Sequence, residues 1–376
     1  MISVELEKKK PFLDYTKTEL AVRFKEMGIP SYRLGQIRRW IFARKTGSFS
    51  EMTDLSKDLR ACLRESFSDL PEGKDSIFSG EIITTSGSPD GTQKILLELA
   101  DGNRVESVLL RDDRNHRTGC ISTQVGCAMG CAFCASGMDG FIRNLTRGEI
   151  LEQILRINSL LPPEERLTHL VIMGTGEPTL NLEPLLSALE DATAQDGLDI
   201  GNRKITISTV GLPEGIRKMA AANVPYKLAV SLHAPNDEIR DRIIPQNRRT
   251  GIAKILEASD FYFHSSGRRT TFEYILIDDL NSRPEHARQL ASLLKNRTAI
   301  VNIIPYNPVP EFSFKTPSSA VVHRFVEILE EGGIQVKVRF RKGDGINAAC
   351  GQLRRSFRKN SDPDLSGKED PDQKIL

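Results

Sequence analysis

The chain carries three cysteines in one short run, Gly126-Cys127-Ala128-Met129-Gly130-Cys131-Ala132-Phe133-Cys134. Their spacing, C-x3-C-x2-C, places three thiolates on a single loop. A closed structural zinc site and a simple electron-transfer iron–sulfur cluster each use four protein ligands. Three cysteines leave one iron of a 4Fe-4S cluster open for a substrate or a cofactor. The alternative is a zinc loop that a distant Cys or His completes.

The composition excludes several classes of protein. The chain has 376 residues, of which 39% are hydrophobic and 27% charged, and its formal net charge is +2. These values are typical of a soluble globular protein with one large core and a smaller appended part. No apolar stretch is long enough to span a membrane, and the N-terminus lacks the apolar segment of a signal peptide. Six cysteines are too few for a disulfide scaffold, so we expect a cytoplasmic protein, and nothing requires more than a monomer.

Residues 1–75 have the pattern of a small, basic, helical domain. Thr16 and Ser31 are placed to cap two successive helices, with a break near Gly28. The second helical pattern carries several basic residues and no acidic residue among them: Arg33, Arg38, Arg39, Arg44 and Lys45. A basic helix is commonly a solvated face. Because this one precedes a larger catalytic part, we predict that the N-terminal domain binds RNA.

Residues 76–112 change to the pattern of an antiparallel sheet. Three strand-like runs, separated by hairpin-turn sequences, cover residues 82–85, 93–99 and 104–110. We predict an antiparallel β extension that joins the N-terminal domain to the part that follows.

Residues 113–355 alternate between short apolar strands and helical patterns. The expected strands cover residues 120–125, 169–173, 205–209, 227–232, 271–277 and 300–304. Such strand–helix repeats imply the α/β class, with a parallel sheet and right-handed crossovers. Because six units cannot close as eight do, we expect an open, partial (β/α)6 barrel with functional residues at the carboxyl ends of its strands. The polar tail, residues 356–376, has little to bury and is expected to be disordered.

Polar residues follow several of these strands at their carboxyl ends. They are Gly176 and Glu177 in the turn 174–178, Ser208, the triplet Ser231-Leu232-His233, and Asn307. Glycines let a backbone approach a ligand closely, and a carboxylate can bind an amino group. Each residue alone is typical of ordinary structural polarity, but together they predict the mouth of a cofactor site. We expect His233 to donate a hydrogen bond to that cofactor rather than to bind a metal.

Three further cysteines lie outside the loop. Cys62 is in the N-terminal domain and is expected to pack there. Cys120 begins the first expected strand of the barrel, and Cys350 lies in a run of small residues beside Gly351. Lone cysteines in such settings are usually buried for packing. The alternative is that the thiols of Cys120 and Cys350 act as resolving partner and nucleophile through a transient disulfide.

These motifs together resemble the RlmN/Cfr family of radical S-adenosylmethionine RNA methyltransferases. The likeness covers nearly the whole chain, from the basic helical domain through Gln352. The motifs that carry it, in the order of the family, are the three-cysteine loop, the Gly-x-Gly-Glu-Pro turn, the Ser-Leu-His triplet, Tyr306-Asn307-Pro308 and Ala348-Ala349-Cys350-Gly351-Gln352-Leu353. Val105-Glu106-Ser107 is similar to the segment that holds the family's proposed proton acceptor, and Ser208 is similar to its cofactor-binding serine.

The resemblance implies a methylation in two stages. It assigns the three-cysteine loop to a 4Fe-4S cluster and uses two S-adenosylmethionine molecules per turnover. One molecule methylates Cys350 by nucleophilic displacement. The other is cleaved to a 5′-deoxyadenosyl radical, which takes a hydrogen from that methyl group so that its carbon adds to an adenine ring. Cys120 then releases the product by forming a disulfide with Cys350, with Glu106 as the base. An electron donor such as flavodoxin or ferredoxin is also implied.

The resemblance further predicts the substrate. RlmN-type members methylate carbon-2 of adenosine in 23S rRNA of the large subunit and in tRNA, whereas Cfr-type members methylate carbon-8. The complete basic N-terminal domain favours the RlmN type. Two positions depart from the common family pattern: Thr175 stands where Met is frequent, and Gly345-Ile346-Asn347 replaces Asp-Ile-Asp.

Binding of RNA is expected to combine neutralised phosphates with a base that is turned out into the mouth of the barrel. Arg339, Arg341 and Lys342 are expected to add to a positive rim around that mouth. A radical enzyme that does not methylate remains the alternative, and it would not need Cys120 and Cys350.

Overall fold

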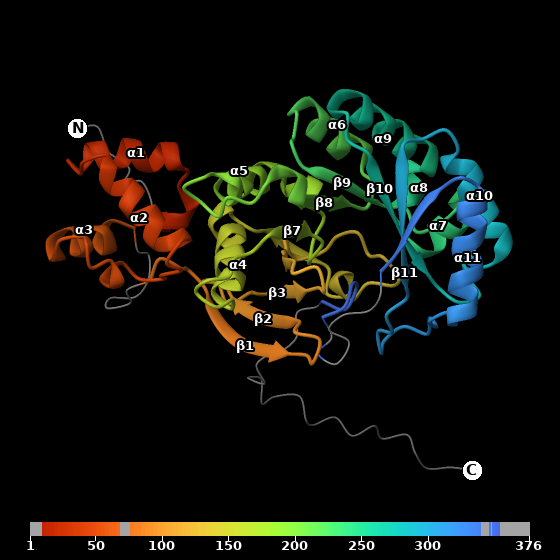
Figure 1. The fold of residues 1–376 in the computed structure, drawn as a ribbon, viewed down its shortest axis with the longest axis horizontal. Helices are drawn as coiled ribbons and strands as arrows, with labels where there is room; N and C mark the ends of the chain where they lie inside the picture. The colour runs from red at the N-terminus through yellow and green to blue at the C-terminus, as the bar shows by residue number, and fades with distance from the viewer. Residues whose placement is uncertain (1–9, 68–75, 340–345, 347, 354–376) are drawn as a thin grey trace, which may run out of the picture.

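The computed structural model describes residues 10–67, 76–339, 346 and 348–353. The tail 356–376, expected to be disordered, lies outside the described residues, as do Arg341, Lys342 and Gly345. Within the described part, no helix is both long enough and apolar enough to cross a membrane. Helices at the N-terminal end form one lobe, and a larger α/β part forms the rest of the molecule (Figure 1).

The N-terminal lobe is built from three helices and two short turns. These are α1 (Lys17–Glu26), α2 (Tyr32–Phe42), α3 (Lys57–Phe67), η1 (Phe12–Asp14) and η2 (Phe49–Glu51). Thr16 caps α1 as predicted, in a reciprocal pair with Glu19. Ser31 precedes α2 but makes no capping hydrogen bond, because its own backbone is already helical, so that prediction is wrong. Phenylalanine rings in edge-to-face contact fill the core of the lobe.

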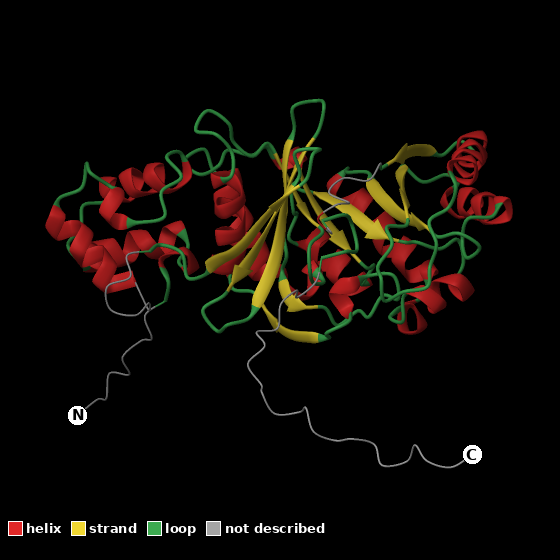
Figure 2. Cartoon of the chain, turned by 90° about the horizontal axis from the view of Figure 1, so that it is seen from below, coloured by secondary structure: helices red, strands yellow, loops and turns green. Residues whose placement is uncertain are grey.

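One ten-stranded sheet runs through the α/β part in the order β1-β2-β3-β4-β7-β8-β9-β10-β11-β12. The first four strands are antiparallel neighbours: β1 (Glu81–Gly87), β2 (Gln93–Glu98), β3 (Arg104–Arg111) and β4 (Arg117–Cys120). From β4 onward all neighbours are parallel: β7 (His169–Ile172), β8 (Ile205–Thr209), β9 (Lys227–Ser231), β10 (Thr270–Leu276), β11 (Ala299–Pro305) and β12 (Gln335–Val338). The parallel strands confirm the predicted partial barrel, and the antiparallel strands extend the same sheet through β4 (Figure 2).

The first parallel strand lies earlier in the chain than predicted, since β4 shares only Cys120 with the predicted range 120–125. It ends at Cys120, and β5 (Gln124–Gly126) pairs instead with β6 (Phe141–Asn144) in a separate two-stranded sheet. The apolar residues up to Val125 suggest one strand, but the N–H groups of Thr123 and Gln124 both donate to the carbonyl of Thr175 in the turn after β7. Ile121 still donates to Val171 of β7, and after it the chain is bonded to that turn.

The last parallel strand, β12, is not predicted from the sequence. It contributes four residues, Gln335–Val338, at the edge of the sheet, and exposed polar side chains alternate with partly buried ones. A short edge strand of this kind lacks the continuous apolar run of a buried parallel strand.

Helices connect the parallel strands and cover the sheet (Figures 1 and 2). They are α4 (Arg147–Ser159), α5 (Leu182–Thr193), α6 (Pro213–Ala221), α7 (Asp237–Ile243), α8 (Asn247–Thr250), α9 (Ile252–Ser266), α10 (Pro284–Leu294) and α11 (Ser319–Glu331), with the short turns η3 (Ala135–Gly137), η4 (Pro178–Asn181) and η5 (Asn202–Lys204). Two of the helical patterns in the sequence, at 146–160 and 284–294, correspond to α4 and α10. Thr146 caps α4 in a reciprocal pair with Glu149, which explains why this helix begins there.

A buried ion-pair network joins the N-terminal lobe to the α/β part. Arg38 of α2 is 2% exposed, and its guanidinium donates to Asp191 at 2.7 Å and to Asp196 at 2.9 Å. Arg147 of α4 donates to the second carboxylate oxygen of Asp191 and to the backbone carbonyl of Leu13. Arginines from both lobes therefore share one carboxylate, and this sharing fixes how the lobes pack.

This network corrects part of the predicted RNA-binding face. Arg38 is buried in ion pairs, and Lys45 donates to the backbone carbonyls of the loop that follows α4. Both side chains are used inside the protein. Arg39 and Arg44 are exposed, and Arg44 stacks over the ring of Trp40 at 4.0 Å. Arg39 and Arg44 are thus available to a phosphate backbone.

Substitution of Arg38 by alanine is expected to lower the free energy of unfolding by about 1 to 3 kcal/mol, because it removes one of the two arginines that pair with the buried carboxylate of Asp191. The matched control is Arg39→Ala on the same helix, which removes an exposed arginine and should change stability by about 0.5 kcal/mol or less. Urea unfolding of both variants measures the difference. Equal midpoints for the two variants would show that the network contributes nothing to the packing of the lobes.

Candidate active site

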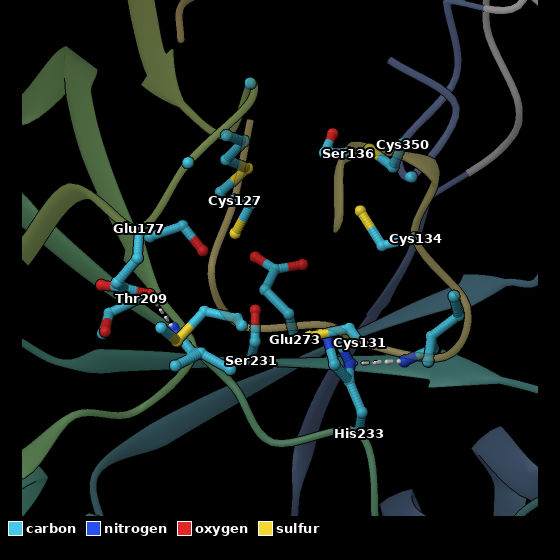
Figure 3. A pocket seen from close by; sticks show the side chains of 18 of the residues that line it. Cys127, Cys131, Cys134, Ser136, Glu177, Thr209, Ser231, His233, Glu273 and Cys350 are labelled. Carbon is cyan, nitrogen blue, oxygen red and sulfur yellow. Dashed lines mark hydrogen bonds between the residues drawn. The ribbon is translucent and has the colours of Figure 1, made fainter. Parts of the chain in front are cut away.

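Two adjoining cavities lie at the carboxyl ends of the parallel strands. The first cavity is lined by the three loop cysteines and by predicted strand-end residues: Gly176, Glu177, Ser208, Ser231 and His233 (Figure 3). The second cavity is lined by Cys120 and Asn307. Four residues line both cavities: Met173, Ile304, Arg339 and Cys350. Cys350 therefore lies where the two cavities meet.

The three loop cysteines are held around the first cavity by backbone hydrogen bonds. Ala132 N–H donates to the carbonyl of Ile243 at the end of α7. Burial raises the pKa of the Cys127 thiol to about 11, and burial also raises the pKa values of Cys131 and Cys134. Within the described residues, no group of three or more His, Cys, Asp or Glu side chains is arranged to hold a single metal ion. Three thiols spread around one cavity fit a group larger than one ion, as an iron–sulfur cluster is.

The glycines of the turn after β7 are required by contact with the chain itself. A Cβ atom on Gly174 would lie 2.7 Å from the backbone nitrogen of Ser122, and one on Gly176 would lie 2.7 Å from Cβ of Gln124. Gly176 also has φ +113, a conformation that side chains disfavour. The structure shows that these glycines admit the segment 122–124, which leads to the cysteine loop. Both also line the first cavity, and contact of Gly176 with a ligand stays a prediction. Thr175, between them, is 7% exposed and is held through its backbone to that segment.

Glu177 forms part of the wall of the first cavity. Its carboxylate accepts from the hydroxyl of Thr179 at 2.6 Å and from the N–H of Val210 at 2.7 Å. Burial raises the pKa of Glu177, and these hydrogen bonds oppose the shift. A carboxylate has more lone pairs than these bonds use. Its contact with the amino group of a cofactor stays a prediction.

His233 is fixed as a neutral hydrogen-bond donor. Its Nδ1 accepts from the N–H of Ile275 at 2.9 Å, so the ring proton is on Nε2. Burial, and then the nearby guanidinium of Arg240, lower the pKa of His233 to about 3. The backbone of His233 has φ +60, and Asn281 holds it there by donating to its carbonyl. These contacts leave Nε2–H as the group that could donate the predicted hydrogen bond to the cofactor.

The other predicted cofactor-binding residues take different positions. The side chain of Leu232 is fully buried in the hydrophobic core. Asn307 lines the second cavity, and its Nδ2 donates to the backbone carbonyl of Cys350 at 3.1 Å. Ser208 and Ser231 line the first cavity as predicted. Asn307 therefore positions the Cys350 loop, a role that its place after β11 does not reveal in the sequence.

The two thiols predicted to act together lie on the same cavity but differ in environment. Cys350 is exposed, whereas Cys120 at the end of β4 is half-buried. Burial, followed by the influence of Cys350, raises the pKa of the Cys120 thiol to about 12. Gly351 accepts a hydrogen bond from Ala135 N–H at 2.8 Å, which ties the Cys350 loop to the cysteine loop.

Glu106 is not brought into either of these cavities. It lies on β3, is 2% exposed, and pairs with Lys94 of β2 at 2.8 Å. It lines a separate small cavity together with Ser136 and Thr175. Its role as a base stays a prediction, and the structure as described does not place it beside Cys350.

The sequence analysis does not predict two charged residues of the site, Glu273 and Arg240, and it expects a third, Arg339, in the wrong place. Glu273 of β10 is 4% exposed, and its carboxylate points into the first cavity (Figure 3). Asn302 donates to one of its oxygens at 3.0 Å, and the other finds no partner within the described residues. Arg240 is fully buried and donates to carbonyls at the ends of β8 and β9. Arg339 lines both cavities, which corrects its expected place on an outer rim.

Comparison with known proteins agrees with this geometry. The model of the radical SAM superfamily matches residues 121–291, and the model of the ribosomal RNA large subunit methyltransferase N-terminal domain matches residues 11–68. A solved structure, a radical SAM methyltransferase from Sphaerobacter thermophilus, superposes with a TM-score of 0.86 at 40% identity and covers 92% of this chain and 99% of that chain. The fold and the site thus define a radical S-adenosylmethionine methyltransferase.

Two relatives show to which family of radical S-adenosylmethionine methyltransferases the chain belongs. A protein of Rhodopirellula baltica described as "Probable dual-specificity RNA methyltransferase RlmN" is 54% identical over 93% of this chain and 92% of its own length. A protein of Desulforamulus reducens with the same description is 46% identical over 92% of this chain and 95% of its own length. The chain belongs to the RlmN family of RNA methyltransferases. Its family implies a 4Fe-4S cluster and S-adenosylmethionine, and the three-cysteine loop fits that requirement.

Proposed function

We propose that the protein methylates carbon-2 of adenosine in 23S rRNA and in tRNA, with Cys350 as the methyl carrier and two molecules of S-adenosylmethionine per turnover. One observation carries this proposal. Cys350 lies at the junction of a cavity lined by the three loop cysteines and a cavity lined by Cys120. A thiol in that position can receive a methyl group on one side and be resolved on the other.

The residues around Cys350 suit it to carry a methyl group. When bound, the cluster and S-adenosylmethionine supply the methyl group and the one-electron chemistry that an unreactive aromatic C–H requires. The exposed thiol of Cys350 acts as the nucleophile that accepts the methyl. Asn307 holds the backbone carbonyl of Cys350, so the sulfur stays at the junction of the cavities while its substituent changes.

Cys120 completes the cycle by releasing the methylated base. Its thiolate attacks the Cys350 sulfur, and a sulfur–sulfur bond forms. The bond from that sulfur to the methylene carbon breaks, and the electron pair goes to the methylene carbon, which gains a proton and becomes a methyl group. The two thiols are oxidised as the methylene is reduced, so the step balances. A reductant must then restore both thiols before the next cycle.

The N-terminal lobe supports an RNA substrate. Arg39 and Arg44 are exposed on this lobe, and the family model for rRNA methyltransferases matches it. These charges neutralise phosphates and leave the target base free to turn out of its helix into the cavities. The description "dual-specificity" of the relatives supports two kinds of RNA substrate. A small electron carrier such as flavodoxin or ferredoxin would reduce the cluster.

The direct test is nucleoside analysis of RNA that has been incubated anaerobically with the cluster-loaded protein, S-adenosylmethionine and a reductant. We expect 2-methyladenosine in fragments of large-subunit rRNA and in tRNA. A product of 8-methyladenosine would assign the carbon-8 reaction instead. Cleavage of S-adenosylmethionine without any methylated adenosine, unchanged in Cys120→Ala and Cys350→Ala, would identify a radical enzyme that does not methylate.

A further inference from the structure

Arg339 is the charged side chain at the junction of the two cavities. It follows β12, and its backbone N–H donates to the carbonyl of Ile303 at 2.8 Å, which fixes where its side chain begins. One guanidinium nitrogen, Nη1, lies 4.0 Å from the sulfur of Cys350 and 3.6 Å from the sulfur of Met173. The side chain lines both cavities, as Cys350 does. The guanidinium therefore lies beside the Cys350 sulfur, whose bonding partner changes in the proposed exchange.

The charges around Arg339 come from both cavities. The thiol of Cys350 raises the pKa of Arg339 most strongly, burial opposes this, and Glu273 and Cys120 act in the same direction as Cys350. The same guanidinium opposes the upward shift that burial imposes on the pKa of Cys120. Arg339 thus interacts electrostatically with both thiols of the proposed exchange.

We propose that Arg339 is a positioning residue for the exchange between Cys120 and Cys350. Its guanidinium orients the Cys350 sulfur and balances the negative charge that passes through that sulfur during the exchange. This inference rests on the proposed function, since it requires that Cys120 resolves an adduct on Cys350. It assigns to Arg339 a task inside the cavities that is separate from binding of RNA phosphates.

The exchange moves a negative charge through the Cys350 sulfur, which lies beside Arg339. The charge starts on the Cys120 sulfur, and a sulfur–sulfur bond forms as the bond from Cys350 to the methylene carbon breaks. The electron pair ends on that carbon, which then takes a proton. Cys350 is exposed, so water also stabilises its thiolate, whereas Cys120 is half-buried and depends more on a nearby fixed charge. Loss of Arg339 should therefore slow attack by Cys120 more than it slows methylation of Cys350.

The test is the Arg339→Met variant, which keeps an unbranched, flexible side chain and removes the guanidinium with its charge. With cluster, S-adenosylmethionine, reductant and RNA, we expect Cys350 to be methylated and RNA to remain covalently attached to the protein. The attached fraction, read on a denaturing gel and by mass of the Cys350 peptide, should exceed that of the unchanged protein by about tenfold or more. Arg339→Lys restores a positive charge and should recover much of the release.

Two controls separate the possible causes. Cys120→Ala removes the resolving thiol and must accumulate the same adduct if the proposed function is right, so its failure would reject that function and not the role of Arg339 alone. Arg111→Met removes another cation of the second cavity, one that pairs with Glu165 at 3.1 Å, and should not accumulate adduct.

Several results would overturn the role of Arg339. If Cys120→Ala traps RNA and Arg339→Met turns over without adduct, the guanidinium is dispensable for the exchange. If Arg339→Met leaves Cys350 unmethylated, its task lies before the exchange. If Arg111→Met traps RNA equally, the effect belongs to the general positive charge of the cavity. If Arg339→Met loses its iron, the Arg339→Lys variant is the test instead. RNA that stays attached to Arg339→Lys, which retains the positive charge, also contradicts the proposal.

Discussion

Replacement of Cys350 by alanine is expected to reduce methylation of RNA by at least about a thousandfold, because it removes the atom that carries the methyl group. The backbone carbonyl of Cys350, which Asn307 holds, is unaffected by the change. The three loop cysteines are also untouched, so iron content and binding of S-adenosylmethionine should stay as in the unchanged protein. Quantification of methylated adenosine by mass spectrometry, with iron measured on the same sample, gives both results.

The matched control for this variant is Cys62→Ala. Cys62 lies on α3 in the N-terminal lobe and lines neither cavity, so its loss should leave methylation unchanged. Substantial product from Cys350→Ala would mean that the methyl group reaches RNA without passing through this thiol. The position of Cys350 between the cavities would then have no chemical meaning.

Substitution of Cys131 by alanine is expected to remove the cluster and with it all activity. Cys131 packs among the apolar side chains next to the first cavity, beside the backbone bond from Ala132 to Ile243. Alanine keeps those backbone contacts, so the chain should still fold. With only two of the three thiolates left, iron per chain should fall from about four to near zero. Iron analysis and the visible absorbance of anaerobically prepared protein measure the loss.

Thermal unfolding of metal-free protein serves as the control for Cys131→Ala. Similar melting temperatures for the variant and the unchanged chain would show that the lost iron reflects a lost ligand and not a lost fold. A variant that keeps a full complement of iron would contradict the assignment of the loop. Colourless protein containing zinc would instead support the alternative of a zinc site.

Local patterns in the sequence predict much of the fold. The capping of α1 and α4 follows from Thr–x–x–Glu spacing, which needs only neighbouring residues. The buried parallel strands follow from short apolar runs between helical patterns. The edge strand β12 and the short strands β5 and β6 do not, because three or four residues form no continuous apolar run. The pairing of Arg38 with Asp191 is likewise set by tertiary packing, so a basic helix face cannot reveal it.

The candidate site likewise has features that the sequence predicts and features that it does not. The cysteine loop and the strand-end residues are contiguous motifs, so their types and spacing identify them. The placement of Cys120 and Cys350 on one cavity depends on the fold of the residues between them, so the sequence offers their pairing only as an alternative to packing, which the family resemblance then favours. Glu273 leaves a usable signal, a charged residue within an otherwise apolar strand, 271–277, that the sequence analysis does not use. Arg339 leaves none, since its neighbours in the chain favour a rim.

The most direct test of methyl transfer through Cys350 follows a labelled methyl group through one turnover. Protein is first loaded on Cys350 with a deuterated methyl group, freed of labelled S-adenosylmethionine, and then given unlabelled S-adenosylmethionine, reductant and RNA. We expect the first methylated adenosine to carry deuterium, because its methyl carbon comes from Cys350. Methylated adenosine without deuterium, while the label stays on Cys350, would contradict the account.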